Sequence, residues 1–156
     1  MSKSLKRVLA EMETLGLQCE IVHKPDGTLT AQDAANGLGC TVGQIVKSIL
    51  FRVAGRDEHV LFLTSGDNRV NPAKAAALAG CALERADAAS IRAWTGFAIG
   101  GVSPFGHLHP VRKFLDEDLL QYDVVWAAAG TPNHNFAINP KALRDVAGAT
   151  VAAFTA

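Results

Sequence analysis

Two apolar segments joined by a short polar turn constrain the fold of this chain more than any other feature. Residues 48–53 and 59–64 have the composition of strands, and residues 54–58 between them are typical of a hairpin turn. The second segment is apolar on both faces, which indicates a strand in the middle of a sheet. Because helical patterns alternate with such strands, we expect one α/β domain over residues 1–156. It is α+β-like, with a mixed, partly antiparallel central sheet flanked by helices.

Local signals place the other elements. Apolar residues at helical spacing predict a helix before Gly16, and cap signals predict helices that begin after Thr30, Asn71, Asp87 and Asn139. A short strand over residues 19–23 should end at the turn formed by Lys24, Pro25, Asp26 and Gly27. Further strands are expected at residues 83–85, 111–115, 122–128, 136–138 and 149–154.

Composition excludes several classes of protein. The 156 residues suffice for a core without disulfide or metal staples. Fifteen basic and fifteen acidic residues give no net charge, which argues against a protein that coats DNA, RNA or membranes, but not against contact with the end of a nucleic acid. The three cysteines form no C-x-x-C motif. Because neither a signal peptide nor a membrane span is evident, we expect a soluble, cytoplasmic protein.

A lysine stands at the mouth of the first apolar strand. Lys47 precedes the run Ser48-Ile49-Leu50-Phe51, and burying an unpaired ammonium is costly. It could be a surface lysine whose stem covers apolar neighbours, which is the commoner case. The alternative is a cation that faces a pocket.

A loop rich in glycine is the second unusual segment. Gly100, Gly101, Pro104 and Gly106 fall within seven residues, so the backbone can approach a ligand closely in one fixed shape. The loop matches neither the dinucleotide fingerprint nor a P-loop, and it could simply be a tight connection. Ser103 lacks the elbow of a nucleophilic serine. Together with a lysine, backbone N–H groups here suggest a pocket for an anionic or carbonyl-bearing ligand.

Polar residues beside turns could complete such a pocket. We expect His23 and His134 to line it, and Asp67 on its rim to meet ligand hydroxyls or phosphate, although turn chemistry alone also accounts for Asp67. His107, His109 and His134 could form a zinc trio. No H-E-x-x-H motif supports such a site, so we expect no metal.

These motifs resemble a known family, the YbaK/ProX-like aminoacyl-tRNA deacylases. Its members are free-standing relatives of the editing domain inserted in bacterial prolyl-tRNA synthetases. The matching segments, which span roughly residues 20 to 145, are residues 30–38, 44–51, 65–71, 95–97, 100–106, 116–117 and 129–130. The resemblance implies a mixed sheet wrapped into a partly closed barrel.

The resemblance also implies an activity and its residues. It implies hydrolysis of the ester between a wrongly attached amino acid and the terminal adenosine of a tRNA, without a cofactor. Lys47 falls on the essential lysine, and Gly100 and Pro104 fall on the G-x-x-x-P substrate loop. N–H groups around Gly100 to Val102 would polarise the ester carbonyl, and the ribose hydroxyl of the substrate would help to orient the water. The expected substrate-binding residues are Gly100, Gly101, Val102, Ser103, Pro104, Gly130, His23, His134 and Asp67.

One departure bears on specificity. Some cysteine-releasing members carry an acidic residue shortly after the region of Gly130, whereas residues 132–136 contain none. This favours a small amino acid such as alanine, serine or an analogue, on tRNAPro, with prolyl-tRNA synthetase as a possible partner. His134 would then meet the substrate amine or water. The alternative is a non-catalytic module that binds tRNA or a synthetase.

Overall fold

Strands and helices alternate along the chain as expected. The structure is a computed structural model that describes residues 2–24 and 30–156, so most of the predicted turn at residues 24–27 lies outside the described residues. The described helices are α1 (Lys3–Thr14), α2 (Ala31–Leu38), α3 (Pro72–Ala79), α4 (Ala88–Thr95) and α5 (Pro140–Ala147), with short 3-10 helices at Val42–Gln44 and Glu117–Gln121. The described strands are β1 (Ile21–His23), β2 (Val46–Val53), β3 (His59–Ser65), β4 (Leu83–Arg85), β5 (Arg112–Asp116), β6 (Val125–Ala128), β7 (His134–Ile138) and β8 (Thr150–Ala152).

The predicted caps hold the helix starts. The side chain of Thr30 accepts a hydrogen bond from the backbone N–H of Asp33 at the start of α2, and that of Asp87 accepts one from Ser90 at the start of α4. The side chains of Asn71 and Asn139 each accept from two backbone N–H groups, and a proline follows each of them in the first turn of α3 and α5. These contacts satisfy N–H groups that have no partner within a helix, which confirms the predicted starts.

The predicted hairpin forms the middle of a five-stranded sheet. Its strand order is β4-β2-β3-β5-β8, with β2 and β3 antiparallel and with β3–β5 and β5–β8 parallel. Every residue of β3 is buried, which confirms its predicted central place. The sheet is therefore mixed, as the alternation of helices and hairpins predicts.

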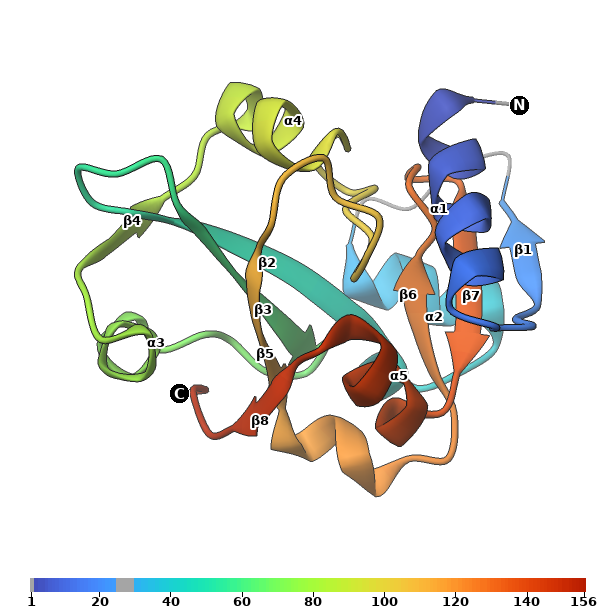
Figure 1. Cartoon of the computed structure of the whole chain (residues 1–156). Helices are drawn as coiled ribbons and strands as arrows, with labels where there is room; N and C mark the ends of the chain where they lie inside the picture. Colours follow the sequence, from blue (N-terminus) through green and yellow to red (C-terminus); the bar gives the residue numbers. More distant parts are fainter. Residues whose placement is uncertain (1, 25–29) are drawn as a thin grey trace.

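A second sheet lies at the end of the domain that is covered by α1. It has three antiparallel strands in the order β1-β7-β6. Leu5, Val8 and Met12 of α1 belong to the same buried cluster as Phe136 of β7 and Ala127 of β6. Figure 1 shows α1, in blue, lying over β7.

The expectation of a partly closed barrel is corrected by this arrangement. The strands form two sheets, and the bridge that links them pairs Ile45, just before β2, with Trp126 of β6. On that same side of β2, β4 pairs only with residues 51–53. Among the described residues, the segment 46–50 therefore has no strand partner on this edge. The sheet does not close, and the open edge of β2 is where the site lies.

Candidate active site

The open edge of β2 borders a cavity of about 360 Å³. Residues from α2, β2, the glycine-rich loop and the β6–β7 hairpin surround it. The described residues that line it are Thr30, Ala31, Ala34, Ile45, Val46, Lys47, Ser48, Ile49, Ile99, Gly100, Val102, Trp126, Ala128 and Asn135. The two segments that the sequence singles out, around Lys47 and around Gly100, thus contribute to one cavity.

Lys47 is the second residue of β2 and pairs with Thr64 of β3, so it stands inside the strand rather than before it. Its side chain is half-buried, and Nζ donates a hydrogen bond to the backbone carbonyl of Asn68. Burial lowers the pKa of Lys47 and the charge of Arg69 lowers it further, whereas the carboxylates of Asp116 and Asp67 act in the opposite direction. Lys47 is thus a cation at the cavity, held to one carbonyl.

The glycine-rich loop approaches the cavity through Gly100 and Val102. Gly100 has φ +85°, a left-handed conformation that favours glycine. The N–H of Gly101 donates to the carbonyl of Ala98 at 2.9 Å and is therefore not available to a ligand. Among the described residues, the N–H groups of Gly100 and Val102 have no protein acceptor. These two N–H groups are the candidate donors to a substrate carbonyl.

The rest of this loop packs away from the cavity. Ser103 and Pro104 are buried and are not part of the cavity lining. The carbonyl of Ser103 lies 2.6 Å from Nε2 of His107, and its hydroxyl has no hydrogen-bond partner among the described residues. Both residues therefore lie on the side of the loop that faces away from the cavity.

The loop is pressed against the β6–β7 hairpin. A Cβ built on Gly101 would lie 2.8 Å from the Cα of Thr131, so a larger residue would collide with backbone. Gly130 is equally enclosed, because a Cβ there would lie 2.7 Å from the backbone oxygen of Ser4 in α1. Gly130 has φ +94° and is buried outside the cavity lining.

The two predicted histidines pair with each other. His23 of β1 lies opposite His134 of β7, and their rings stack with centroids 4.6 Å apart. Nδ1 of His134 lies 2.7 Å from the hydroxyl of Thr131. Neither histidine belongs to the cavity lining. Burial lowers the pKa of His134, and the neighbouring His23 lowers it further.

Asn135 is the residue that the sequence reasoning missed. It is only 8% exposed, lines the cavity, and its side-chain nitrogen has no hydrogen-bond partner among the described residues. Successive residues of a strand point to opposite faces, so when His134 stacks on His23 its neighbour faces the other side. Strand alternation around residue 134 places Asn135 on the face opposite His134, but it does not say which of the two faces meets the cavity.

Asp67 lies on the loop after β3, and its side chain is exposed. A Cβ built on Gly43 would lie 2.9 Å from Oδ2 of Asp67, which places this carboxylate against the short helix before β2. Asp67 is not part of the cavity lining, and it bears on the site through its charge near Lys47.

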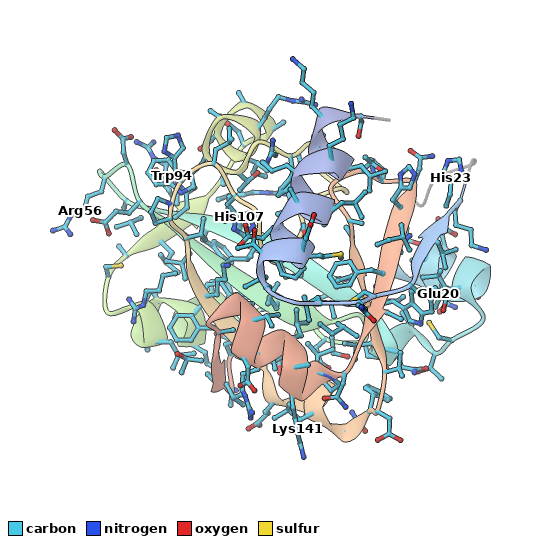
Figure 2. The ribbon with its side chains drawn as sticks, turned by 45° about the vertical axis from the view of Figure 1, so that its right-hand side comes forward. Glu20, His23, Arg56, Trp94, His107 and Lys141 are labelled. Atoms are coloured by element: carbon cyan, nitrogen blue, oxygen red, sulfur yellow. The ribbon has the colours of Figure 1, made fainter. Side chains whose placement is uncertain are left out.

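The three histidines of the zinc alternative lie in separate surroundings. His107 packs edge-on against Phe97, His109 lies against Trp94, and His134 stacks on His23. Figure 2 shows His107 in the middle of the molecule and His23 near one side of it. In the part of the chain that the structure describes, no three His, Cys, Asp or Glu residues are grouped so as to hold a metal.

A second hollow, of about 490 Å³, lies at the far end of the β2–β3 hairpin. Its lining includes Arg56, His59, Trp94 and Arg112, and no residue predicted for the site. Figure 2 places Trp94 and Arg56 on the side of the molecule opposite His23. The cavity at Lys47 is the smaller of the two, but it joins the lysine to the glycine-rich loop.

The fold and this cavity define an editing domain of the kind that acts on aminoacyl-tRNA. Residues 25–146 match the aminoacyl-tRNA editing domain family, and the chain belongs to it. The family resemblance inferred from the sequence is thereby confirmed. No described helix is long and apolar enough to cross a membrane.

Several proteins and solved structures are similar to this chain. A crystal structure of "a putative trans-editing enzyme for prolyl tRNA synthetase" is similar at 45% identity and a TM-score of 0.93, covering 100% of this chain and 99% of that one. The uncharacterized protein YwhH of Bacillus subtilis (strain 168) is 28% identical over 91% of this chain and 90% of its own length.

Two further relatives carry names that describe reactions of tRNA. A "Putative Cys-tRNA(Pro)/Cys-tRNA(Cys) deacylase EbsC" of Enterococcus faecalis is 26% identical over 81% of this chain and 77% of its own length. The proline–tRNA ligase of Nitratidesulfovibrio vulgaris (strain DP4) is 34% identical over 64% of this chain, a match that covers 17% of the ligase.

Proposed function

We propose that this protein is a trans-editing deacylase that hydrolyses the ester of a mischarged tRNA in the cytoplasm. The observation that carries the proposal is that Lys47 of β2 and Gly100 and Val102 of the glycine-rich loop line one cavity at the open edge of β2. Membership of the editing-domain family supports hydrolysis of an aminoacyl-tRNA ester. The names of two relatives support prolyl-tRNA synthetase as the enzyme whose errors are corrected.

The arrangement suits ester hydrolysis by electrostatic stabilisation. The N–H groups of Gly100 and Val102 would donate to the ester carbonyl and stabilise the oxyanion that forms when water attacks the carbonyl carbon. Lys47 would anchor the acceptor end and stabilise charge near the scissile bond. Cleavage of the C–O bond then releases the amino acid as a carboxylate and leaves a free hydroxyl on the terminal ribose, with one proton of the attacking water passing to the ribose oxygen and the other to solvent. Among the described residues that line the cavity, no histidine or carboxylate offers a general base, which fits a water oriented partly by the ribose hydroxyl.

The same cavity favours a small amino acid on tRNAPro. Ala31, Ala34 and Ala128 line it together with the ring of Trp126, and residues 132–136 contain no acidic side chain. The relative EbsC is named for the release of cysteine. We infer alanine, serine or an analogue as the released residue from the absence of an acidic side chain at residues 132–136, because apolar walls alone discriminate a methylene by only ~1–3 kcal/mol.

The test is release of amino acid from a panel of mischarged tRNAs. Purified protein is incubated with Ala-, Ser-, Thr- and Cys-tRNA, each on tRNAPro and on its own tRNA. We expect release from one or a few of them, and we expect Lys47→Ala to reduce it by about a hundredfold or more. Lys141→Ala is the matched control, because this exposed lysine lies on α5 and points away from the molecule (Figure 2).

Two results would contradict the proposal. Unchanged hydrolysis by Lys47→Ala would remove the lysine from the mechanism. Binding of the same tRNAs without turnover by the wild-type protein would instead identify a non-catalytic module that binds tRNA or a synthetase.

A further inference from the structure

A buried carboxylate is hydrogen-bonded to the loop that follows β3. The backbone of this loop accepts a hydrogen bond from Lys47. Asp116, the last residue of β5, is only 1% exposed. Its Oδ2 accepts hydrogen bonds from the backbone N–H of Ser65 at 3.0 Å and from the side-chain amide of Asn68 at 2.9 Å. Its Oδ1 accepts from the backbone N–H of Asp118 at 3.0 Å. Two of these three bonds hold the turn that follows β3.

That turn also presents the acceptor of Lys47. The backbone N–H of Asn68 donates to the carbonyl of Ser65 at 2.9 Å, which closes the turn, and the carbonyl of Asn68 accepts from Nζ of Lys47. Asn68 therefore binds the carboxylate through its side chain and the lysine through its backbone. A displacement of the turn would displace the acceptor of the ammonium.

We propose that Asp116 and Asn68 are positioning residues of the deacylase. The Asp116 carboxylate fixes the turn at residues 65–68 through the Asn68 amide, and the Asn68 carbonyl then fixes the Lys47 ammonium at the cavity. This inference rests on the proposed function for its kinetic consequences, but not for the geometry itself. Neither residue touches the cavity, so both act on the substrate only through Lys47.

Charge adds to this geometry. The charged groups that act on Lys47 are Arg69 and Asp67, on the same loop, and Asp116 on β5. The two carboxylates favour the ammonium form and Arg69 disfavours it. Loss of the Asp116 charge should therefore lower the pKa of Lys47 as well as loosen the turn.

The first test is Asn68→Ala, which removes the amide that donates to Asp116 and to Asp118 and keeps the carbonyl that accepts from Lys47. We expect kcat on the best mischarged tRNA to fall roughly ten- to hundredfold with KM little changed, because a small misplacement of a catalytic group has effects of this size. Asn36→Ala is the matched control, since this asparagine is exposed on α2 and, among the described residues, accepts a hydrogen bond from Gln32 alone. Wild-type kcat in Asn68→Ala would overturn the inference.

A second test does not depend on activity. In protein labelled with ¹³Cε-lysine, Lys47→Ala identifies the Lys47 signal, which is then titrated in the wild type, Asn68→Ala and Asp116→Asn. We expect a lower Lys47 pKa in Asp116→Asn and a displaced signal in Asn68→Ala. A Lys47 signal and pKa unchanged in both variants would overturn the inference. If the wild type deacylates nothing, the proposed function fails, and this titration alone decides whether Asp116 and Asn68 position the lysine.

Discussion

The rings of His23 and His134 stack at 4.6 Å, so a proton on one ring opposes a proton on the other. This contact joins β1 to β7, and the hydroxyl of Thr131 fixes the second ring through Nδ1. The pair lies on the face of β7 opposite Asn135, outside the cavity lining.

The pair makes a prediction about titration. Burial lowers the pKa of His134, and His23 lowers it further. We expect the His134 pKa, measured by NMR titration of the imidazole protons, to lie below its ordinary value. It should rise in His23→Gln, because the second charge is then absent. A His134 pKa unaffected by that substitution would show that the two rings do not interact electrostatically.

His107 should make the folded state sensitive to acid. Burial, followed by the charge of Lys113, lowers the pKa of His107 to about 4. In the unfolded chain it returns to its ordinary value near 6.5. Between these two values the unfolded state binds more protons, so the free energy of unfolding falls as the pH falls. The full loss is roughly 3 kcal/mol.

Urea unfolding at several pH values measures this loss. We expect His107→Gln to flatten the decline between pH 6.5 and 4, whereas His109→Gln should leave it unchanged, because His109 is exposed. An equal decline in the wild type and in His107→Gln would assign the acid sensitivity to other groups.

Gly101 should be intolerant of a side chain. In Gly101→Ala the new Cβ would lie 2.8 Å from the Cα of Thr131, so the glycine-rich loop and the β6–β7 hairpin must separate. We expect a loss of about 1–3 kcal/mol in the free energy of unfolding, together with a loss of deacylation, because Gly100 and Val102 move with the loop. Thermal unfolding and the release assay measure the two effects.

Gly37→Ala is the matched control. Among the described residues its Cβ would meet the flexible end of Lys24 alone, at an ordinary 3.6 Å. Since Gly37 lies within α2, alanine should stabilise the protein by up to ~1 kcal/mol and leave deacylation intact. Equal stability of the two alanine variants would contradict the close packing of Gly101.

Replacing Asn135 with an apolar residue should raise stability and lower activity. The residue is 8% exposed and its side-chain nitrogen has no partner among the described residues, which is unfavourable in a folded protein. We expect Asn135→Leu, of similar size, to raise the free energy of unfolding by about 1 kcal/mol. It should also lower deacylation, because the cavity loses a polar group. A variant that is both less stable and less active would indicate a structural role only.

Local sequence signals predicted much of the fold. The caps at Thr30, Asn71, Asp87 and Asn139 and the hairpin of β2 and β3 depend on residues close together in the chain, and all are confirmed. The split into two sheets was not predicted, because it depends on how β2 meets β6, whose residues lie some eighty positions later.

Some residues of the site could likewise be predicted from the sequence, and others could not. Lys47 and Gly100 stand out because their residue types are unusual in such surroundings, and the structure places both at one cavity. Asp116 and Asn135 could not be found so easily. The contact between Asp116 and Asn68 spans 48 positions, and the placing of Asn135 depends on which face of β7 meets α1.

The tight packing of Gly130 against Ser4 indicates which residues fold together as one domain. The match to the editing-domain family starts at residue 25, after α1 has ended. Yet a Cβ on Gly130 would meet the backbone of α1 at 2.7 Å, and the adjoining Thr131 supports the loop of Gly101. The cooperative folding unit is therefore larger than the segment by which the family is recognised. A protein trimmed to that segment would keep every described residue that lines the cavity and lose the helix against which the β6–β7 hairpin packs.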